Sequence, residues 1–201
     1  MRQRRFRRAG AVLAAIIGST LLLPTTGVVA QDPAPVERLR MATVGDESTL
    51  NPYTYVTGFP GWNLLMLQYD SLMQIDVTGV PQPWLASGVS VSEDGATYTV
   101  DLTPGVTFND GEPLTADDVV FTVEYFQANT QSRFTRALRS VTAVEAPTDT
   151  QVVFTLAGPN PSFPLRTLAD VPIIPRHIWE SVETPAEHVF ESATNVGSGP
   201  Y

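Results

Sequence analysis

The chain of 201 residues carries 21 acidic against 12 basic side chains, has a formal net charge of −9 and contains no cysteine. This acidic balance argues against nucleic acid and anionic lipid surfaces as partners, because both carry negative charge. Without cysteine, this span has no disulfides, thiol catalysis, thiolate metal sites or lipid-modified N-terminal cysteine.

Residues 1–30 have the pattern of an export signal. Five arginines precede an uncharged, largely apolar stretch at residues 9–23, and residues 28–30 resemble a cleavage site. A membrane anchor is the alternative, but the apolar run is shorter than the roughly 20 residues that cross a bilayer. We therefore expect cleavage near Ala30 and a periplasmic or secreted product that is not a lipoprotein. The choice between general secretory and twin-arginine export stays open.

Residues 31–60 predict a linker, a strand and a long loop. Residues 31–37 are rich in proline and alanine, residues 38–44 alternate as a strand does, and residues 45–60 have loop composition. From Gly61 the period becomes that of an amphipathic helix, and Pro60 suits its first turn. The predicted apolar stripe consists of Trp62, Leu65, Met66, Tyr69, Leu72 and Met73.

The following segment predicts two antiparallel hairpins that flank a second helix. The first hairpin turns at residues 93–95, and the second pairs residues 141–144 with 152–156. Thr115 opens the helix as an N-cap, with Asp118 in a capping-box arrangement. Its predicted buried stripe is Val119, Val120, Val123 and Phe126.

The last fifty residues predict short helical pieces at residues 164–169 and 175–181. The mixture of helices and antiparallel hairpins predicts an α/β or α+β class built on a sheet. Residues 197–201 have the composition of a turn that leads into a further segment, so we expect the chain to be truncated.

A long block of residues then resembles a known family. It comprises residues 84–87 (WLAS), 91–99 (VSEDGATYT) and 104–121 (PGVTFNDGEPLTADDVVF). This block resembles the signature of the family 5 extracellular solute-binding proteins, the dipeptide, oligopeptide and nickel receptors. The flanking segments agree in order: residues 49–52 (TLNP), 69–72 (YDSL), 174–177 (IPRH) and 197–201 (GSGPY).

The resemblance implies a two-lobed periplasmic-binding-protein type II fold in the α/β class, of which this chain holds the N-terminal part. After the signal peptide (1–30) and the linker (31–37), residues 38–201 would form the N-terminal portion of the solute-binding domain. Lobe one would start at residues 38–60, the family's extra α+β subdomain would span about 61–190, and about 191–201 would return to lobe one. By this resemblance we expect the second lobe to be missing from this chain.

Side chains that could suggest catalysis or metal binding have simpler explanations in the sequence. Asp94 and Asp110 precede glycines in turns, and Asp117 and Asp118 lie in a first helical turn, so we expect structural roles and no catalytic residues. His177 and His188 are the only histidines, too few for a metal site without further ligands, and we expect helix-end or surface positions.

The loop before the first helix is the predicted ligand-binding segment. Its candidate contacts have aromatic faces, donors or bare backbone, and they lead into a helix N-terminus with unpaired N–H groups. In the resembling family the matching loop lies beside the cleft. The alternative is that Tyr53 and Trp62 only pack lobe one. The predicted contacts are Tyr53, Tyr55, Thr57, Gly58 and Phe59.

The resemblance implies the substrate-binding component of an ABC importer, which captures peptides and delivers them to the transmembrane subunits of a permease. We expect a monomer without cofactor, enzymatic activity or nucleic-acid partner. The same fold with another cargo, such as a nickel chelate, haem or an oligosaccharide, is the first alternative. A secreted hydrolase that uses His177 with a carboxylate is the second.

Overall fold

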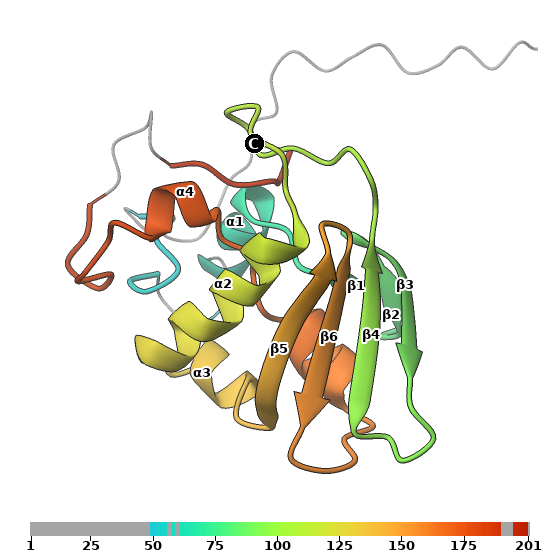
Figure 1. Ribbon diagram of the computed structural model, residues 1–201. Helices are drawn as coiled ribbons and strands as arrows, with labels where there is room; N and C mark the ends of the chain where they lie inside the picture. The colour runs from blue at the N-terminus through green and yellow to red at the C-terminus, as the bar shows by residue number, and fades with distance from the viewer. Residues whose placement is uncertain (1–48, 56–57, 59–60, 190–194, 201) are drawn as a thin grey trace, which may run out of the picture. The chain divides into compact units, whose positions relative to one another are not determined.

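The computed structural model describes residues 49–55, 58, 61–189 and 195–200. Its larger sheet has four antiparallel strands, with helix α2 (Ala116–Ala128) beside it (Figure 1). The predicted signal peptide, linker and strand at residues 38–44 lie outside the described residues. The spatial order is β3 (Ala86–Val91), β4 (Thr97–Leu102), β6 (Gln151–Leu156) and β5 (Val141–Thr148). Both predicted hairpins are therefore confirmed, and β4 and β6 pair to join them.

The two inner strands bury one face of the sheet. Tyr98 lies opposite Phe154 and Val100 opposite Val152, and all four side chains are buried. Because side chains alternate along a strand, the intervening threonines and Asp101 point to the other face. This alternation of apolar and polar residues is the pattern from which the hairpins were predicted.

The hairpin turns differ in how well their bounds were predicted. The β3–β4 turn contains Gly95 at φ +69°, a conformation that glycine adopts without strain. In the second hairpin β5 runs on to Thr148 and β6 begins at Gln151, so the strands are longer and the turn is shorter than predicted. A register irregularity between Glu145 and Thr148 accommodates the extra residues.

Helix α2 (Ala116–Ala128) begins as predicted, with the Thr115 backbone N–H donating to the Asp118 carboxylate at 2.9 Å. Its buried side is wider than predicted. Val120 is only half-buried, whereas Thr122 is fully buried. The Thr122 hydroxyl donates to the Asp118 carbonyl at 2.7 Å and accepts the Ile174 N–H at 3.1 Å, which explains how a polar side chain fits there.

Helix α1 spans Gly61–Gln68. It is shorter than the predicted helix, whose apolar stripe ran on to Met73. Met73 instead begins β1 (Met73–Ile75), which pairs with β2 (Pro81–Pro83) in a small hairpin. The helix ends where the backbone of residues 197–199 crosses it, with the Gly199 N–H bonded to the Gln68 carbonyl at 3.0 Å. Trp62 and Met66, predicted in the stripe, are half-buried.

Short helical pieces complete the described residues: α3 (Phe134–Ala137), the π-helical turn η1 (Pro164–Leu168) and α4 (Arg176–Trp179). The last two confirm the predicted pieces. Phe163, just before η1, packs on the buried face of the sheet with ring centroids 4.9 Å from Tyr98 and 5.5 Å from Phe154. No helix within the described ranges is long and apolar enough to cross a membrane.

Candidate functional site

The loop before α1 is described at three of its five predicted contact positions. Tyr53, Tyr55 and Gly58 are described, and Thr57 and Phe59 lie outside the described residues.

Tyr53 belongs to an aromatic cluster with α2 and α4. Its ring stacks on Phe126 with centroids 5.4 Å apart and lies 6.0 Å from Trp179. Its hydroxyl donates to the Asn129 carbonyl at 3.0 Å, and burial raises the pKa of this phenol. What remains exposed lines an open hollow of about 290 Å³ beside Asn129, Thr130 and residues 184–187. The contacts of Tyr53 are thus those of the packing alternative, and ligand contact stays a prediction.

Tyr55 is buried, contrary to the expectation of an exposed loop position. Only 5% of the residue is exposed, and its ring lies 6.2 Å from Phe134 and 6.4 Å from Trp62. Burial raises the pKa of the Tyr55 hydroxyl, and the nearby Arg133 guanidinium lowers it in part. This burial was not predicted, because the aromatic partner Phe134 comes from a segment distant in the sequence.

Gly58 is exposed and adopts φ +142°, a conformation that strains any L side chain. Its carbonyl accepts the Trp62 N–H at 2.9 Å, which ties this glycine to the first turn of α1. Loop conformation and helix start therefore depend on each other at this position.

Trp62 carries a stacked arginine that sequence reasoning missed. The guanidinium carbon of Arg133 lies 3.8 Å from the ring centroid of Trp62, close enough for a cation–π interaction. The same guanidinium bonds the Asp170 carboxylate through Nη2 and, at 3.0 Å, through Nε. No spacing in the sequence links these three segments, so pattern reasoning had no signal for the arrangement.

His177 lies near the start of α4, as the helix-end expectation proposed, and it pairs with a carboxylate. Its Nε2 is 2.7 Å from Asp110 Oδ2, and its ring edge contacts Phe108. Asp110 also accepts the Glu112 N–H, and although burial acts in the opposite direction, the bond from His177 holds the pKa of Asp110 below its usual range. Over the described ranges, no cluster of three or more His, Asp or Glu could hold a metal ion.

The other carboxylates of the signature block make local bonds. Asp94 accepts the Ala96 N–H at 3.0 Å and the Ser92 hydroxyl, and these bonds lower its pKa. Asp118 caps α2 and also accepts the Arg176 N–H at 3.0 Å, which joins α2 to α4. These contacts are the structural roles that the sequence predicted for Asp94 and Asp118.

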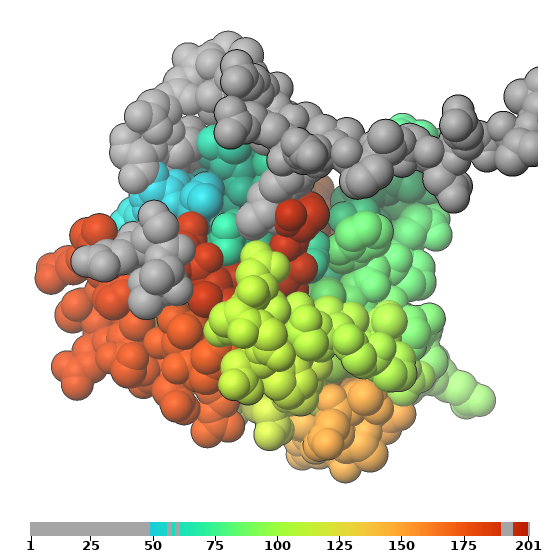
Figure 2. All heavy atoms as spheres, turned by 90° about the horizontal axis from the view of Figure 1, so that it is seen from above, coloured from blue at the N-terminus to red at the C-terminus, as the bar shows by residue number. Residues whose placement is uncertain are grey.

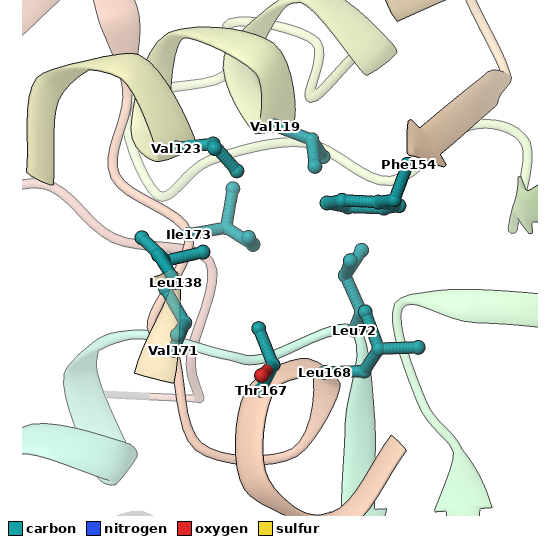
Figure 3. Close-up of a pocket in the computed structure, with 9 residues that line it drawn as sticks. All are labelled: Leu72, Val119, Val123, Leu138, Phe154, Thr167, Leu168, Val171 and Ile173. Atoms are coloured by element: carbon teal, nitrogen blue, oxygen red, sulfur yellow. The ribbon is translucent and has the colours of Figure 1, made fainter. Parts of the chain in front are cut away.

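A small apolar pocket lined by buried residues lies between α2, β6 and η1, and Figure 3 shows Phe154, Val119 and Val123 pointing into it. Its volume of about 10 Å³ holds at most one water-sized sphere, and the lining is almost wholly apolar. The one hydroxyl, from Thr167, is already bonded to the Ala137 carbonyl at 2.8 Å. We therefore interpret this pocket as a packing void of the core and not as a ligand site.

The return segment at residues 195–200 lies against α1 and the loop before α2 (red in Figure 2). The Gly197 carbonyl accepts the Asn109 N–H at 2.9 Å, and Gln68 Nε2 donates to the Asn195 carbonyl at 2.7 Å. The return segment is thus hydrogen-bonded to two parts of the predicted subdomain.

Comparison with known proteins gives consistent matches. Residues 80–201 match the family of bacterial extracellular solute-binding proteins, family 5 Middle. Protein XP55 of Streptomyces lividans is 32% identical over 197 residues, which cover 97% of this chain and 35% of that protein.

Solved structures extend this likeness to the fold. The oligopeptide-binding protein AppA of Bacillus subtilis, in complex with a nonapeptide, is 30% identical, with a TM-score of 0.66 over 75% of this chain and 30% of AppA. NikZ of Campylobacter jejuni, in complex with Ni(L-His), is 27% identical, with a TM-score of 0.65 over 78% of this chain and 31% of NikZ. The chain spans about a third of the length of these relatives, and the predicted α/β type II fold is confirmed over that part.

Proposed function

Since this chain belongs to the bacterial extracellular solute-binding proteins of family 5, we propose that it is the N-terminal part of a receptor that captures peptides for an ABC importer. The likeness to nonapeptide-bound AppA supports peptide as the cargo, at 30% identity over three quarters of this chain. The loop before α1, with Tyr53, Tyr55, Thr57, Gly58 and Phe59, is the proposed lobe-one contact.

A peptide would be held extended between two lobes, largely through its main chain. Every peptide offers the same backbone donors and acceptors, so backbone recognition accepts many sequences. Closure around the cargo follows from its greater affinity for the closed state, and the loaded form then meets the permease. The exposed Gly58 suits such contact, because a residue without a side chain lets another backbone approach closely.

The proposal includes export and free diffusion outside the cytoplasm. Cleavage near Ala30 would leave all 21 acidic but only 7 of the 12 basic residues, a net charge of −14. We propose that the mature receptor is a monomer with transmembrane permease subunits as its protein partners. Its lack of cysteine is consistent with a receptor that is not tethered through a lipidated cysteine.

A metal chelate is the second candidate cargo, because NikZ in complex with Ni(L-His) matches this chain almost as well as AppA does. Haem and oligosaccharides are further cargoes that this fold could hold. A hydrolase that uses His177 would need a nucleophile against the imidazole. In the described part of the chain, the His177 side chain bonds Asp110, and no serine or threonine hydroxyl bonds either residue.

Native mass spectrometry of the full-length mature protein, purified from an exporting host without refolding, tests the proposal. We expect bound masses that form a ladder of peptide values and are displaced by added peptide. A single non-peptide mass would instead assign a chelate, haem or sugar. Cleavage of added peptides that is abolished in His177→Ala would favour the hydrolase.

A further inference from the structure

The two ends of the proposed contact loop are held next to each other by one aromatic residue. Tyr55 and Trp62 bracket the predicted contacts at positions 57–59, and their ring centroids are 6.4 Å apart. Phe134, which has no exposed surface, lies 6.2 Å from each of them. Tyr55 and Trp62 therefore both pack against the same buried side chain of the core.

Arg133, the residue before Phe134, contacts Trp62 at the start of α1. Its guanidinium lies over the Trp62 ring at 3.8 Å and is fixed in orientation by two bonds to Asp170. A planar, two-bonded guanidinium loses little further freedom when it stacks on an indole. The Arg133 backbone is fixed as well, because its N–H donates to Gln131 Oε1 at 2.8 Å.

The contact between Arg133 and Trp62 also affects Gly58 in the loop. The Trp62 N–H is bonded to the Gly58 carbonyl, so a shift of the indole would move the first turn of α1 and this glycine together. About a third of the Arg133 side chain is exposed, and its charge is already compensated by Asp170. The arrangement thus suits holding the loop more than binding an anionic group of the cargo.

We propose that Arg133, bonded to Asp170 and stacked on Trp62, is a positioning residue that fixes Gly58 and the first turn of α1 for contact with cargo. This inference rests on the proposed function of the contact loop. A contact position that is fixed beforehand loses less conformational freedom on binding, so affinity depends on Arg133 even without a bond between Arg133 and the cargo.

Hydrogen exchange on the full-length mature protein tests whether Arg133 fixes Gly58 and the start of α1. In Arg133→Met, we expect the Trp62 amide to exchange at least tenfold faster, with no change at Val100 and Val152 in the central strands. Arg136→Met, an exposed arginine of α3, is the matched control and should leave the Trp62 amide unchanged. Unchanged exchange in Arg133→Met, or an equal increase in the control or the strands, overturns the proposal.

Binding of a pool of randomised nonapeptides, measured by native mass spectrometry, tests whether Arg133 contributes to cargo affinity. We expect about tenfold weaker binding in Arg133→Met, an intermediate loss in Arg133→Lys, which keeps the cation but not the planar fork, and no loss in Arg136→Met. Faster exchange with unchanged affinity overturns the positioning role. If the wild type binds no peptide, the proposed function fails, and the exchange rates still decide whether Arg133 fixes Gly58 and the start of α1.

Discussion

Gly199 donates its backbone N–H to the carbonyl oxygen of Gln68 at 3.0 Å, so the return segment closes over the end of α1. A Cβ on Gly199 would lie 2.3 Å from the Leu67 carbonyl oxygen, and one on Gly197 would lie 1.9 Å from the Gln68 carbonyl oxygen. These are backbone atoms that cannot yield without moving the helix. Glycine is therefore required at both positions for close approach, whatever their φ angles.

Gly197→Ala should lower the free energy of unfolding by about 2 kcal/mol or more, the range of a core overpacked against backbone. Gly158→Ala is the matched control, because a Cβ there meets nothing within 4 Å and its φ is not in the left-handed region. That variant should be neutral or gain up to about 1 kcal/mol through loss of freedom in the unfolded chain. Urea unfolding measures both, and equal effects would contradict the contact argument.

Asp118→Ala should destabilise the fold more than Asp117→Ala, its neighbour in the first turn of α2. Asp118 is 6% exposed and accepts two backbone N–H groups, from Thr115 and Arg176, which its loss would leave without this partner. We expect a loss of about 2–4 kcal/mol from two charge-assisted bonds. Asp117 is exposed and should cost about 0.3–1 kcal/mol through the helix dipole. Chemical denaturation of both variants checks the difference. Similar losses would contradict the role of Asp118 in capping α2 and joining it to α4.

The features predicted correctly are those whose causes lie close together in the chain. Alternation around Gly95 fixed the first hairpin, and the Thr115–Asp118 pair marked the start of α2, because each signal needs only a few neighbouring residues. The strand lengths of the second hairpin were less exact, because its register irregularity depends on pairing with β6.

The features that were missed depend on contacts between distant segments. α1 stops at Gln68 because the return segment crosses it, although its apolar period continues in the sequence. Thr122 is buried because Ile174 supplies a hydrogen-bond partner, and Tyr55 because Phe134 covers it. A periodic pattern reports which side of a helix is apolar, but it does not identify the segment that packs there.

Two aspartates should contribute to the pH dependence of stability with opposite signs, and Asp70 is the first of them. Burial raises the pKa of Asp70 above its ordinary value near 3.8, although hydrogen bonds from Trp84 and Ser198 lower it in part. The folded state therefore binds more protons between the two pKa values, and stability falls as pH rises through that window. Asp70→Asn keeps an acceptor for the Trp84 N–H, 2.8 Å away, without the buried charge. Relative to wild type, it should gain stability as pH rises through the window and then level off.

Asp76 gives the opposite case and serves as the control. The Thr78 hydroxyl, followed by the Val80 N–H, lowers the pKa of Asp76 to about 2. The stability that Asp76 contributes is present above the unfolded pKa and is lost as pH falls toward the folded one. Asp76→Asn should therefore approach wild-type stability as pH falls below about 4. Denaturation at a series of pH values measures both differences, and slopes of the same sign would contradict the assignment.

Gly58→Ala should weaken cargo binding, whereas its cost in folding stability should match that of a control glycine. Gly58 is exposed at φ +142° with nothing within 4 Å of a new Cβ, so the cost is local backbone strain in the proposed contact loop. Gly79→Ala is the matched control, because Gly79 has φ +85° and equally open surroundings in the turn between β1 and β2. Both variants should lose about 1 kcal/mol of folding stability. Calorimetry of the full-length protein with a bound peptide should show about tenfold weaker affinity for Gly58→Ala alone, because the strain moves the loop away from its binding geometry. Equal affinities in the two variants would remove Gly58 from the proposed site.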